Sequence, residues 1–374
     1  MKKTLSVCLG IVLLACCETP SALAKDEIQK LTDRLLAVPT IRTEPGFTAS
    51  VLVKPGHLYD PVWLMAHDGV VWTNDDGGEE GDKGSQIVAI SKTGTLSVVV
   101  GLGRQLPVTG FGIAPVGFGA FGGQLVSMAQ AEVAAPGATK NHIIQRVDLK
   151  TTAASTLVCT LPTAGTVNNG ISGFGADARF GPPHSPFADR FFAATIFNNT
   201  IYQVKADGSC TPFATFDGKT WAEPLGIAFS ADGQRMLVSV TKGTTLSASA
   251  KAEGAIVSVA ADGTVDAKPV AEGFARPTGI MRAPASFGAY AGQLFVTDAG
   301  KMEIPVPMTQ TLAADGKVYR VTAEGAVQLV ASGFVNPTGI EFVDNALWVS
   351  DINGDFIAGK RELPDGFIVK ISPR

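Results

Sequence analysis

One stretch near the end of the chain spaces its side-chain oxygens as a calcium-binding loop does. In the window from 351 to 362, the first, third, fifth and twelfth positions hold Asp351, Asn353, Asp355 and Glu362. Carboxylate and amide oxygens are the ligands that Ca²⁺ prefers, and this is their spacing in a twelve-residue calcium loop. Phe356 stands where such a loop normally has glycine, and no helices are expected beside it. A site for calcium or another divalent cation in this loop is therefore a hypothesis to test.

A second set of polar residues lies directly before or after apolar, strand-like segments. Three acids in this set are candidate catalytic bases: Asp298, Glu223 and Asp60. The candidate ligand-binding residues are Asn169, Arg276, Asn336, Thr278, Thr338 and Asp75. A ring of such groups can hold a cation or a hydroxyl-rich ligand, and a carboxylate beside a bound metal or water can act as a base. The alternative is capping, in which Asp, Asn and Thr only bond the backbone amides of their own turns.

An internal repeat places these residues at equivalent positions. Its clearest copies, Pro277-Thr278-Gly279-Ile280 and Pro337-Thr338-Gly339-Ile340, are sixty residues apart. Weaker copies begin at Pro224, Asn168, Pro107 and Asp60. Each copy opens a unit that reads as four short strands joined by turns, and 42 glycines suit such tight connections. Four strands repeated six times predict an all-β fold, a six-bladed β-propeller of four-stranded blades.

The two ends of the chain complete this architecture. The sixth unit stops after its third strand, at residues 367–371, and a segment from Phe47 to Val53 resembles the missing fourth strand. We therefore expect the N-terminal strand to complete the last blade. Before it, apolar residues spaced as on one helix face predict a short helix from about Asp26 to Ala37. The resulting division is a signal peptide at 1–24, an N-terminal helical arm at 25–45 and the propeller at 46–374.

Long connections point to the functional end of this propeller. Five of the six links between second and third strands are extended, and only the link from Phe197 to Thr200 is tight. The long links are 74–86, 129–143, 241–255, 298–317 and 351–366. In a propeller these links share one face with the loops that enter the innermost strands, so they predict a walled polar pocket at one end of the central channel. Plain surface loops are the alternative.

The first 24 residues read as a targeting segment. Lys2 and Lys3 precede an apolar run that is too short to span a bilayer, and Ala22-Leu23-Ala24 fits a cleavage site. Export to the periplasm or the exterior is expected, with a lipid anchor on Cys16 as the alternative. The remaining Cys159 and Cys210 could form a disulfide or stay as two buried thiols. A formal charge of -4 gives no reason to bind nucleic acid or an anionic membrane surface.

The proline-glycine phrases, together with Phe229–Val238, resemble NHL repeats and the senescence-marker-protein and gluconolactonase propellers. That resemblance implies a divalent cation held by Glu, Asn and Asp before inner strands, and hydrolysis of a lactone. Asn169 matches an asparagine ligand, whereas Tyr59, Leu225, Thr278 and Thr338 stand where the family has Glu, Asn and Asp. A weaker similarity links Phe287–Asp298 to sugar dehydrogenase propellers that use pyrroloquinoline quinone. Their catalytic histidine has no counterpart before Gly279.

These observations favour one function and leave two alternatives. The favoured function is an exported, metal-assisted hydrolase of a lactone or sugar-like substrate, using Ca²⁺ or another divalent cation. The first alternative is a non-catalytic, NHL-like module that binds a ligand or a protein. The second is a quinone-dependent sugar dehydrogenase. The expected partner is a small polar molecule, and we expect a monomer with no membrane span.

Overall fold

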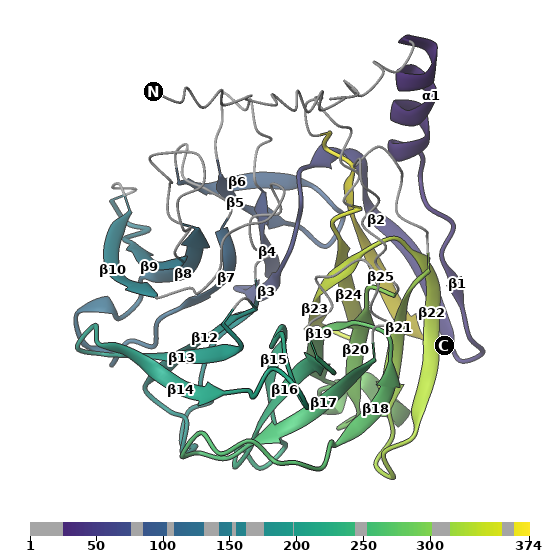
Figure 1. The fold of residues 1–374 in the computed structure, drawn as a ribbon. Coiled ribbons are helices and arrows are strands. Elements are labelled where there is room, and N and C mark those ends of the chain that lie inside the picture. Colours follow the sequence, from purple (N-terminus) through teal and green to yellow (C-terminus); the bar gives the residue numbers. More distant parts are fainter. Residues whose placement is uncertain are drawn as a thin grey trace, which may run out of the picture.

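Six antiparallel sheets surround a central axis in the computed structural model, as the repeat predicts (Figure 1). The structure describes residues 25–75, 85–102, 108–130, 142–151, 155–161, 176–196, 198–243, 253–300, 315–353 and 363–374. First strands of neighbouring blades contact one another, for example β19 with β23 and β7 with β11, so the first strand of each blade is its innermost. No helix among the described residues has the length and apolar composition needed to cross a membrane.

In the first four blades the first strand along the chain is the innermost and the last the outermost, whereas β1 and β2 from the N-terminal part of the chain form the outer edges of the fifth and sixth. The first blade consists of β3 (Leu64–His67), β4 (Val70–Asp75), β5 (Gln86–Ile90) and β6 (Leu96–Gly101). The second consists of β7 (Val108–Ile113), β8 (Leu125–Gln130), β9 (His142–Val147) and β10 (Thr156–Leu161). The third consists of β11 (Ala178–Phe180), β12 (Arg190–Thr195), β13 (Thr200–Lys205) and β14 (Cys210–Thr215).

The remaining blades keep the same order. The fourth consists of β15 (Ile227–Phe229), β16 (Met236–Thr241), β17 (Gly254–Val259) and β18 (Ala271–Phe274). The fifth consists of β19 (Pro277–Arg282), β20 (Leu294–Asp298), β21 (Gly316–Val321), β22 (Val327–Phe334) and the added β1 (Arg42–Thr43). The sixth consists of β23 (Pro337–Val343), β24 (Ala346–Asp351), β25 (Gly366–Pro373) and β2 (Phe47–Leu58). Short 3₁₀ helices lie at Gly119–Phe121 and Ala285–Tyr290.

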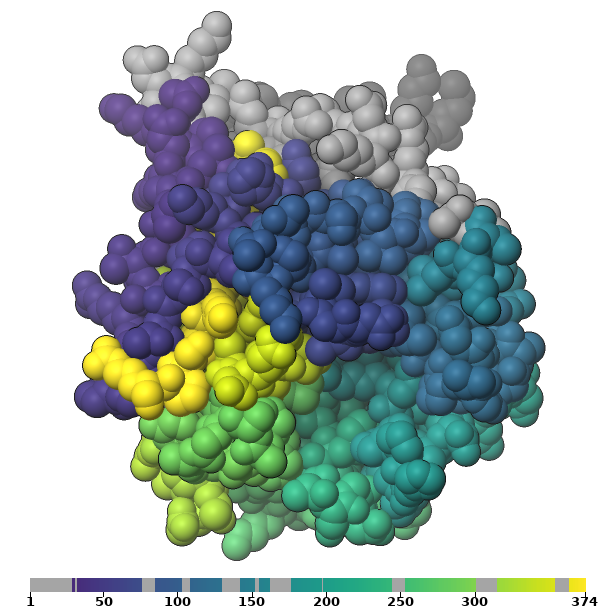
Figure 2. Space-filling model, turned by 180° about the vertical axis from the view of Figure 1, so that it is seen from behind, coloured from purple at the N-terminus to yellow at the C-terminus, as the bar shows by residue number. Residues whose placement is uncertain are grey.

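The N-terminal strand closes the ring, which confirms the prediction. β2 runs antiparallel to β25, with Phe47 opposite Pro373 and Leu58 opposite Gly366. Figure 2 shows the purple N-terminal residues beside the yellow C-terminal ones. Phe47 is buried and stacks on Tyr290 of the fifth blade, with ring centroids 4.5 Å apart. The strand is longer than the predicted segment, which ended at Val53.

The N-terminal arm does more than the predicted helix. Helix α1 (Lys25–Leu35) stands at the rim of the propeller (Figure 1), and the chain then adds β1 to the outer edge of the fifth blade, a pairing that was not predicted. Gly333 of β22 permits this approach, because a Cβ there would lie 2.3 Å from the carbonyl oxygen of Thr40. Its φ of 94° also favours glycine.

The glycine of the repeated phrase has a packing role. A Cβ on Gly226 would lie 2.2 Å from the carbonyl oxygen of Thr278 in the next blade, and one on Gly279 would lie 2.3 Å from that of Thr338. Neither glycine has a positive φ, so close approach of the innermost strands, rather than backbone conformation, demands the missing side chain. The phrase therefore marks the contact between successive blades.

Buried hydroxyls join these same strands. Ser239 Oγ accepts a hydrogen bond from the Gly226 amide at 2.7 Å and donates to the Thr278 carbonyl at 2.6 Å. Thr297 Oγ1 likewise accepts from Gly279 and donates to Thr338 of the next blade, at 2.7 and 2.9 Å. Ser350 repeats the arrangement between the sixth and first blades. We call Ser239, Thr297 and Ser350 the hydroxyl clamps.

A disulfide adds a covalent link between two blades. Cys159 of β10 and Cys210 of β14 are bonded, with Cα atoms 6.4 Å apart. Of the two alternatives left open by the sequence, the structure therefore has the disulfide. It joins the outermost strands of the second and third blades.

Candidate functional site

Four of the predicted site residues occupy one equivalent position at one end of the channel. Asp60, Glu223, Arg276 and Asn336 each directly precede the proline that begins or leads into an innermost strand. We call these four the entry ring. Glu223, Arg276 and Asn336 are almost completely buried, whereas Asp60 is half-buried. The structure thus brings these four predicted residues to the same end of the propeller.

The two acids of the entry ring have an unusual backbone. Asp60 and Glu223 adopt φ values of 41° and 51°, in the left-handed region that non-glycine residues seldom occupy. The surroundings hold Glu223 in place, because Asn199 Oδ1 accepts its amide proton at 2.8 Å and Thr241 Oγ1 donates to Glu223 Oε2 at 3.1 Å. Such conformations persist only where neighbouring contacts fix them, and they are frequent at binding sites.

Arg276 adds a buried cation whose charge interacts with two acids. Burial lowers the pKa of its guanidinium, and the charges of Glu223 and Asp298 oppose that shift. A charged group this deeply buried needs such partners, because desolvation of an isolated charge is costly. Glu223 and Arg276 therefore give the entry ring opposite, interacting charges, and Asp298 adds a second negative charge from outside the ring.

Asp298 has a structural use that the sequence left open. Its carboxylate accepts amide protons from Ala275 at 2.8 Å, Arg276 at 2.7 Å and Gly300 at 2.9 Å. Asp75 acts in part in the same way, since it accepts from the Tyr59 amide at 2.9 Å and from Gln86 Nε2 at 2.7 Å. These contacts fix the loops that lead into the innermost strands, so for both residues the geometry favours the capping alternative.

Asp351 repeats the contacts of Asp298 in the sixth blade. It accepts amide protons from Val335, Asn336 and Asn353, at 2.8, 3.0 and 2.8 Å. Burial raises the pKa of Asp351 to about 6, although the three amide donors oppose the shift. The first position of the predicted calcium loop is therefore engaged with the backbone.

The rest of the predicted calcium loop is only partly described. Asn353 Nδ2 donates to the carbonyl oxygens of Leu35 and Asp365, at 3.3 and 3.4 Å, which ties the end of α1 to the sixth blade. Asp355 and Glu362 lie outside the described residues. In the part of the chain that the structure describes, no three His, Cys, Asp or Glu side chains form a group that could hold a metal. Calcium binding stays a prediction.

The two predicted threonines lie on the innermost strands. Thr278 Oγ1 is within hydrogen-bond distance of Thr297 Oγ1 at 2.9 Å and of the Pro337 carbonyl at 2.7 Å, so it belongs to the contact between blades. Thr338 Oγ1 is buried and has no hydrogen-bond partner among the described residues.

The third blade departs from the predicted repeat. Its innermost strand begins at Ala178, seven residues after the Gly170-Ile171 pair that the repeat aligned with the other blades. Asp177 holds the place that Thr278 holds in the fifth blade, because a Cβ on Gly110 of the second blade would meet Asp177 and Ala178 as one on Gly226 would meet Thr278 and Gly279. Asn169 lies outside the described residues.

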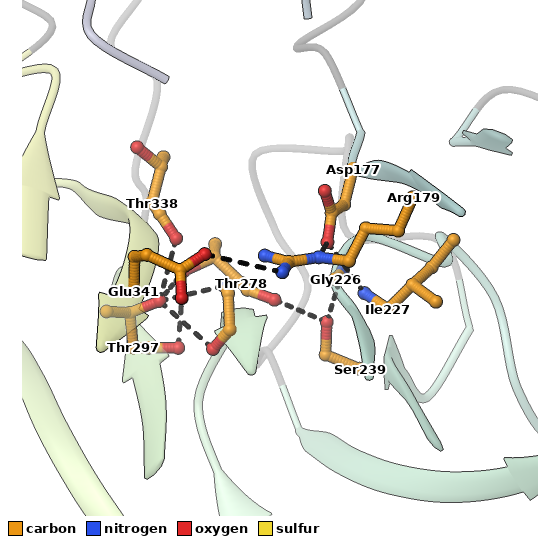
Figure 3. Close-up of polar contacts among 10 residues, drawn as sticks. Asp177, Arg179, Gly226, Ile227, Ser239, Thr278, Thr297, Thr338 and Glu341 are labelled. Carbon is orange, nitrogen blue, oxygen red and sulfur yellow. Dashed lines mark hydrogen bonds and ion pairs between the residues drawn. The ribbon is translucent and has the colours of Figure 1, made fainter. Parts of the chain in front are cut away.

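A charged cluster inside the channel was missed by the sequence analysis. Arg179 of β11 extends toward the sixth blade, with its Nη1 3.9 Å from Glu341 Oε2 of β23, and its Nε donates to Asp177 Oδ2 (Figure 3). Asp177 Oδ2 also accepts the Ile227 amide at 3.1 Å. We call Asp177, Arg179 and Glu341 the channel cluster. The signal for it was a charged residue inside each of two apolar innermost strands.

The protonation behaviour of the channel cluster follows from its burial. Burial raises the pKa of Glu341, and the Arg179 charge opposes that rise. For Arg179, burial alone would lower the pKa, but Asp177 and Glu341 together raise it. The side chains of Arg179 and Glu341 are 18% and 13% exposed, so water reaches part of each, although Arg179 Nη2 itself is buried.

Comparisons with known proteins extend the fold assignment. No protein-family model and no curated protein matches the sequence. Among solved structures, a glucose dehydrogenase shares 13% identity over 87% of this chain and 100% of its own, with a TM-score of 0.57. A structural-genomics target described as a gluconolactonase has 13% sequence identity over 90% of this chain and 98% of its own, with a TM-score of 0.50. A streptogramin B lyase has 13% sequence identity over 88% of this chain and 98% of its own, also with a TM-score of 0.50. The chain therefore has the fold of the gluconolactonase and sugar dehydrogenase structures that its sequence resembles.

Proposed function

We propose that this protein binds a small, hydroxylated or lactone-like molecule in the central channel, beside the channel cluster. One observation carries the proposal: Arg179 Nη2 is buried without a hydrogen-bond partner among the described residues. A guanidinium has five N–H donors, and a buried donor that makes no hydrogen bond costs about 1–3 kcal/mol. A carbonyl or hydroxyl oxygen of a ligand would satisfy that donor. Thr338, at the start of β23, offers a second unpaired group.

Hydrolysis of a lactone is the reaction that we propose for this site. Arg179 would polarise the ester carbonyl, while Glu341, whose pKa is raised by burial, would take a proton from the attacking water. The water oxygen bonds to the carbonyl carbon, the ring C–O bond breaks, and the departing oxygen takes a proton to leave a hydroxy acid. These two side chains supply both the electrophilic and the basic group of the reaction.

The leader and the disulfide support export as part of this proposal. Disulfides persist in oxidising compartments such as the periplasm and the cell exterior, and the Cys159–Cys210 bond suits that environment. The predicted divalent cation is a separate proposal for the 351–362 loop. It predicts a higher melting temperature with Ca²⁺ than with a chelator, because a ligand that binds only the folded state stabilises it.

The test uses residues 25–374 with a panel of five- and six-membered lactones and free aldoses. Melting temperature reports binding, and acid release at constant pH reports turnover. We expect Arg179→Lys, which keeps the charge but removes the fork of donors, to weaken binding about tenfold. We expect Glu341→Gln to reduce kcat about 100-fold or more. Arg235→Lys is the matched control, since Arg235 pairs with Asp266 away from the channel cluster.

The outcomes separate the proposed activities. Unchanged binding in Arg179→Lys would overturn the channel site. Binding that depends on Arg179, without turnover of any lactone, would overturn hydrolysis and leave the ligand-binding module.

A further inference from the structure

A cavity of about 600 Å³ lies outside the channel, between the N-terminal arm and the fifth and sixth blades. The arm supplies one wall with residues from Arg34 to Arg42, and the blades supply the other with residues such as Lys317, Ser332 and Phe367. No residue of the entry ring or of the channel cluster lines it. Its volume falls in the range of small-molecule sites, about 300–1,000 Å³.

The wall of this cavity carries an aligned pair of cations. In the fifth blade, Arg42 of β1 lies opposite Ser332 of β22, which lies opposite Lys317 of β21. Residues directly opposite one another in an antiparallel sheet share a face, so the two cations flank one hydroxyl on neighbouring strands. We call Arg42, Ser332 and Lys317 the basic rung.

Nothing in the described part of the chain neutralises the basic rung. Neither Arg42 nor Lys317 forms an ion pair or side-chain hydrogen bond with a described residue. The acid of the lining, Asp315, has its carboxylate turned toward Gly300, where an added Cβ would lie 2.2 Å from Asp315 Oδ1. Neighbouring strands lie about 4.8 Å apart, so these two cations stand about 10 Å apart on either side of Ser332. An anion bound beside Ser332 would lie between two positive charges.

We propose that this cavity binds a small molecule through an oxyanion, with Arg42 and Lys317 as its charge partners and Ser332 Oγ as a hydroxyl donor. Arginine and lysine are the usual partners of carboxylate and phosphate groups. The neighbouring apolar residues Leu35, Val38 and Phe367 would contact the remainder of the ligand. The arm is then one wall of a binding site as well as an addition to the fifth blade.

The test measures the melting temperature and the heat of binding of residues 25–374 with inorganic phosphate and with citrate. Sodium chloride keeps the ionic strength constant, and the two anions distinguish a phosphate source from a carboxylate source. We expect a saturable response to at least one of them. Arg42→Gln and Lys317→Gln should each raise the dissociation constant of the anion that binds about tenfold, and Ser332→Ala should raise it several-fold.

Lys54→Gln is the control, because Lys54 is exposed on β2 and does not line the cavity. It should bind as the unchanged protein does. Arg42 is exposed, so its replacement tests the site even if a change at Lys317 disturbs the fold. No saturable response to either anion, or equal binding by Arg42→Gln and the unchanged protein, would overturn the proposal. Since the channel cluster is elsewhere, this result is independent of the proposed activity.

Discussion

His142, at the start of β9, is a buried histidine that the candidate site does not use. It is 4% exposed, its Nδ1 has no hydrogen-bond partner among the described residues, and burial lowers its pKa to about 4. In the unfolded chain the same histidine would bind a proton near pH 6.5. The free energy of unfolding therefore has its full value above pH 6.5 and falls as the pH drops from 6.5 through 4, because only the unfolded state gains a proton in that range. The linked free energy is about 3 kcal/mol.

The corresponding prediction concerns His142→Gln. Removal of the titrating group should make the free energy of unfolding fall less steeply between pH 6.5 and 4 than it does in the unchanged protein. Urea denaturation at several pH values across that window measures the difference. His67→Gln is the control, since His67 is only partly buried. Parallel pH profiles for the unchanged protein and His142→Gln would contradict this account.

Two side chains of the same chemical type can have different roles because their neighbours differ, and the sequence shows little about those neighbours. Asp298 and Glu341 are both acids on strands of the blades, but three backbone amides occupy the buried Asp298, whereas Glu341 is partly exposed and faces a cation across the channel. The sequence left Asp298 open between a catalytic base and a backbone cap, because turn position alone does not distinguish the two roles. The partner of Glu341 comes from the third blade, and no local pattern relates Arg179 to it.

At the level of strands, the hydroxyl clamps are the repeated device that sets the spacing of blades. Thr297 Oγ1 serves Gly279, Thr278 and Thr338 at once, within hydrogen-bond distance of each. Thr297→Val keeps the shape but leaves the Gly279 amide and the Thr338 carbonyl without this partner, at about 1–3 kcal/mol for each group, whereas Thr278 Oγ1 keeps the Pro337 carbonyl. We expect a loss of about 2–4 kcal/mol in the free energy of unfolding, measured by chemical denaturation.

A matched control for this prediction is Thr156→Val, on the exposed face of β10. Its stability should change by less than about 0.5 kcal/mol, as for most surface substitutions. Thr297→Ser keeps the hydroxyl and should recover most of the loss. Equal stability of Thr297→Val and Thr156→Val would show that the clamp contributes nothing.

The same elements explain how much of the fold the sequence predicts. The glycines of the repeated phrase are required by close approach of neighbouring strands, so Gly279 and Gly339 revealed two innermost strands directly. In the third blade the corresponding residues are Asp177 and Ala178, and the phrase is unrecognisable there. β1 contains only two residues, too few for any periodic pattern, and so its pairing with β22 was not predicted.

At the scale of the whole molecule, two kinds of link between distant parts of the chain stabilise the ring. β2 joins the first part of the chain to the last blade through hydrogen bonds, while the Cys159–Cys210 disulfide joins the second and third blades covalently. A bond between residues 51 apart removes conformational entropy from the unfolded chain, worth about 4 kcal/mol in the loop-closure model. An oxidising compartment preserves such a bond, whereas a reducing compartment would remove it.

The final prediction concerns the contribution of the Cys159–Cys210 disulfide to the stability of the purified, oxidised protein. The Cys159→Ala, Cys210→Ala double variant should lose up to about 4 kcal/mol in its free energy of unfolding. Because the effect comes from the covalent constraint, dithiothreitol should lower the stability of the unchanged protein and leave the double variant unaffected. Chemical denaturation with and without the reductant measures both differences. A double variant as stable as the oxidised protein would mean that the strand pairing and packing of the second and third blades hold the ring without the disulfide.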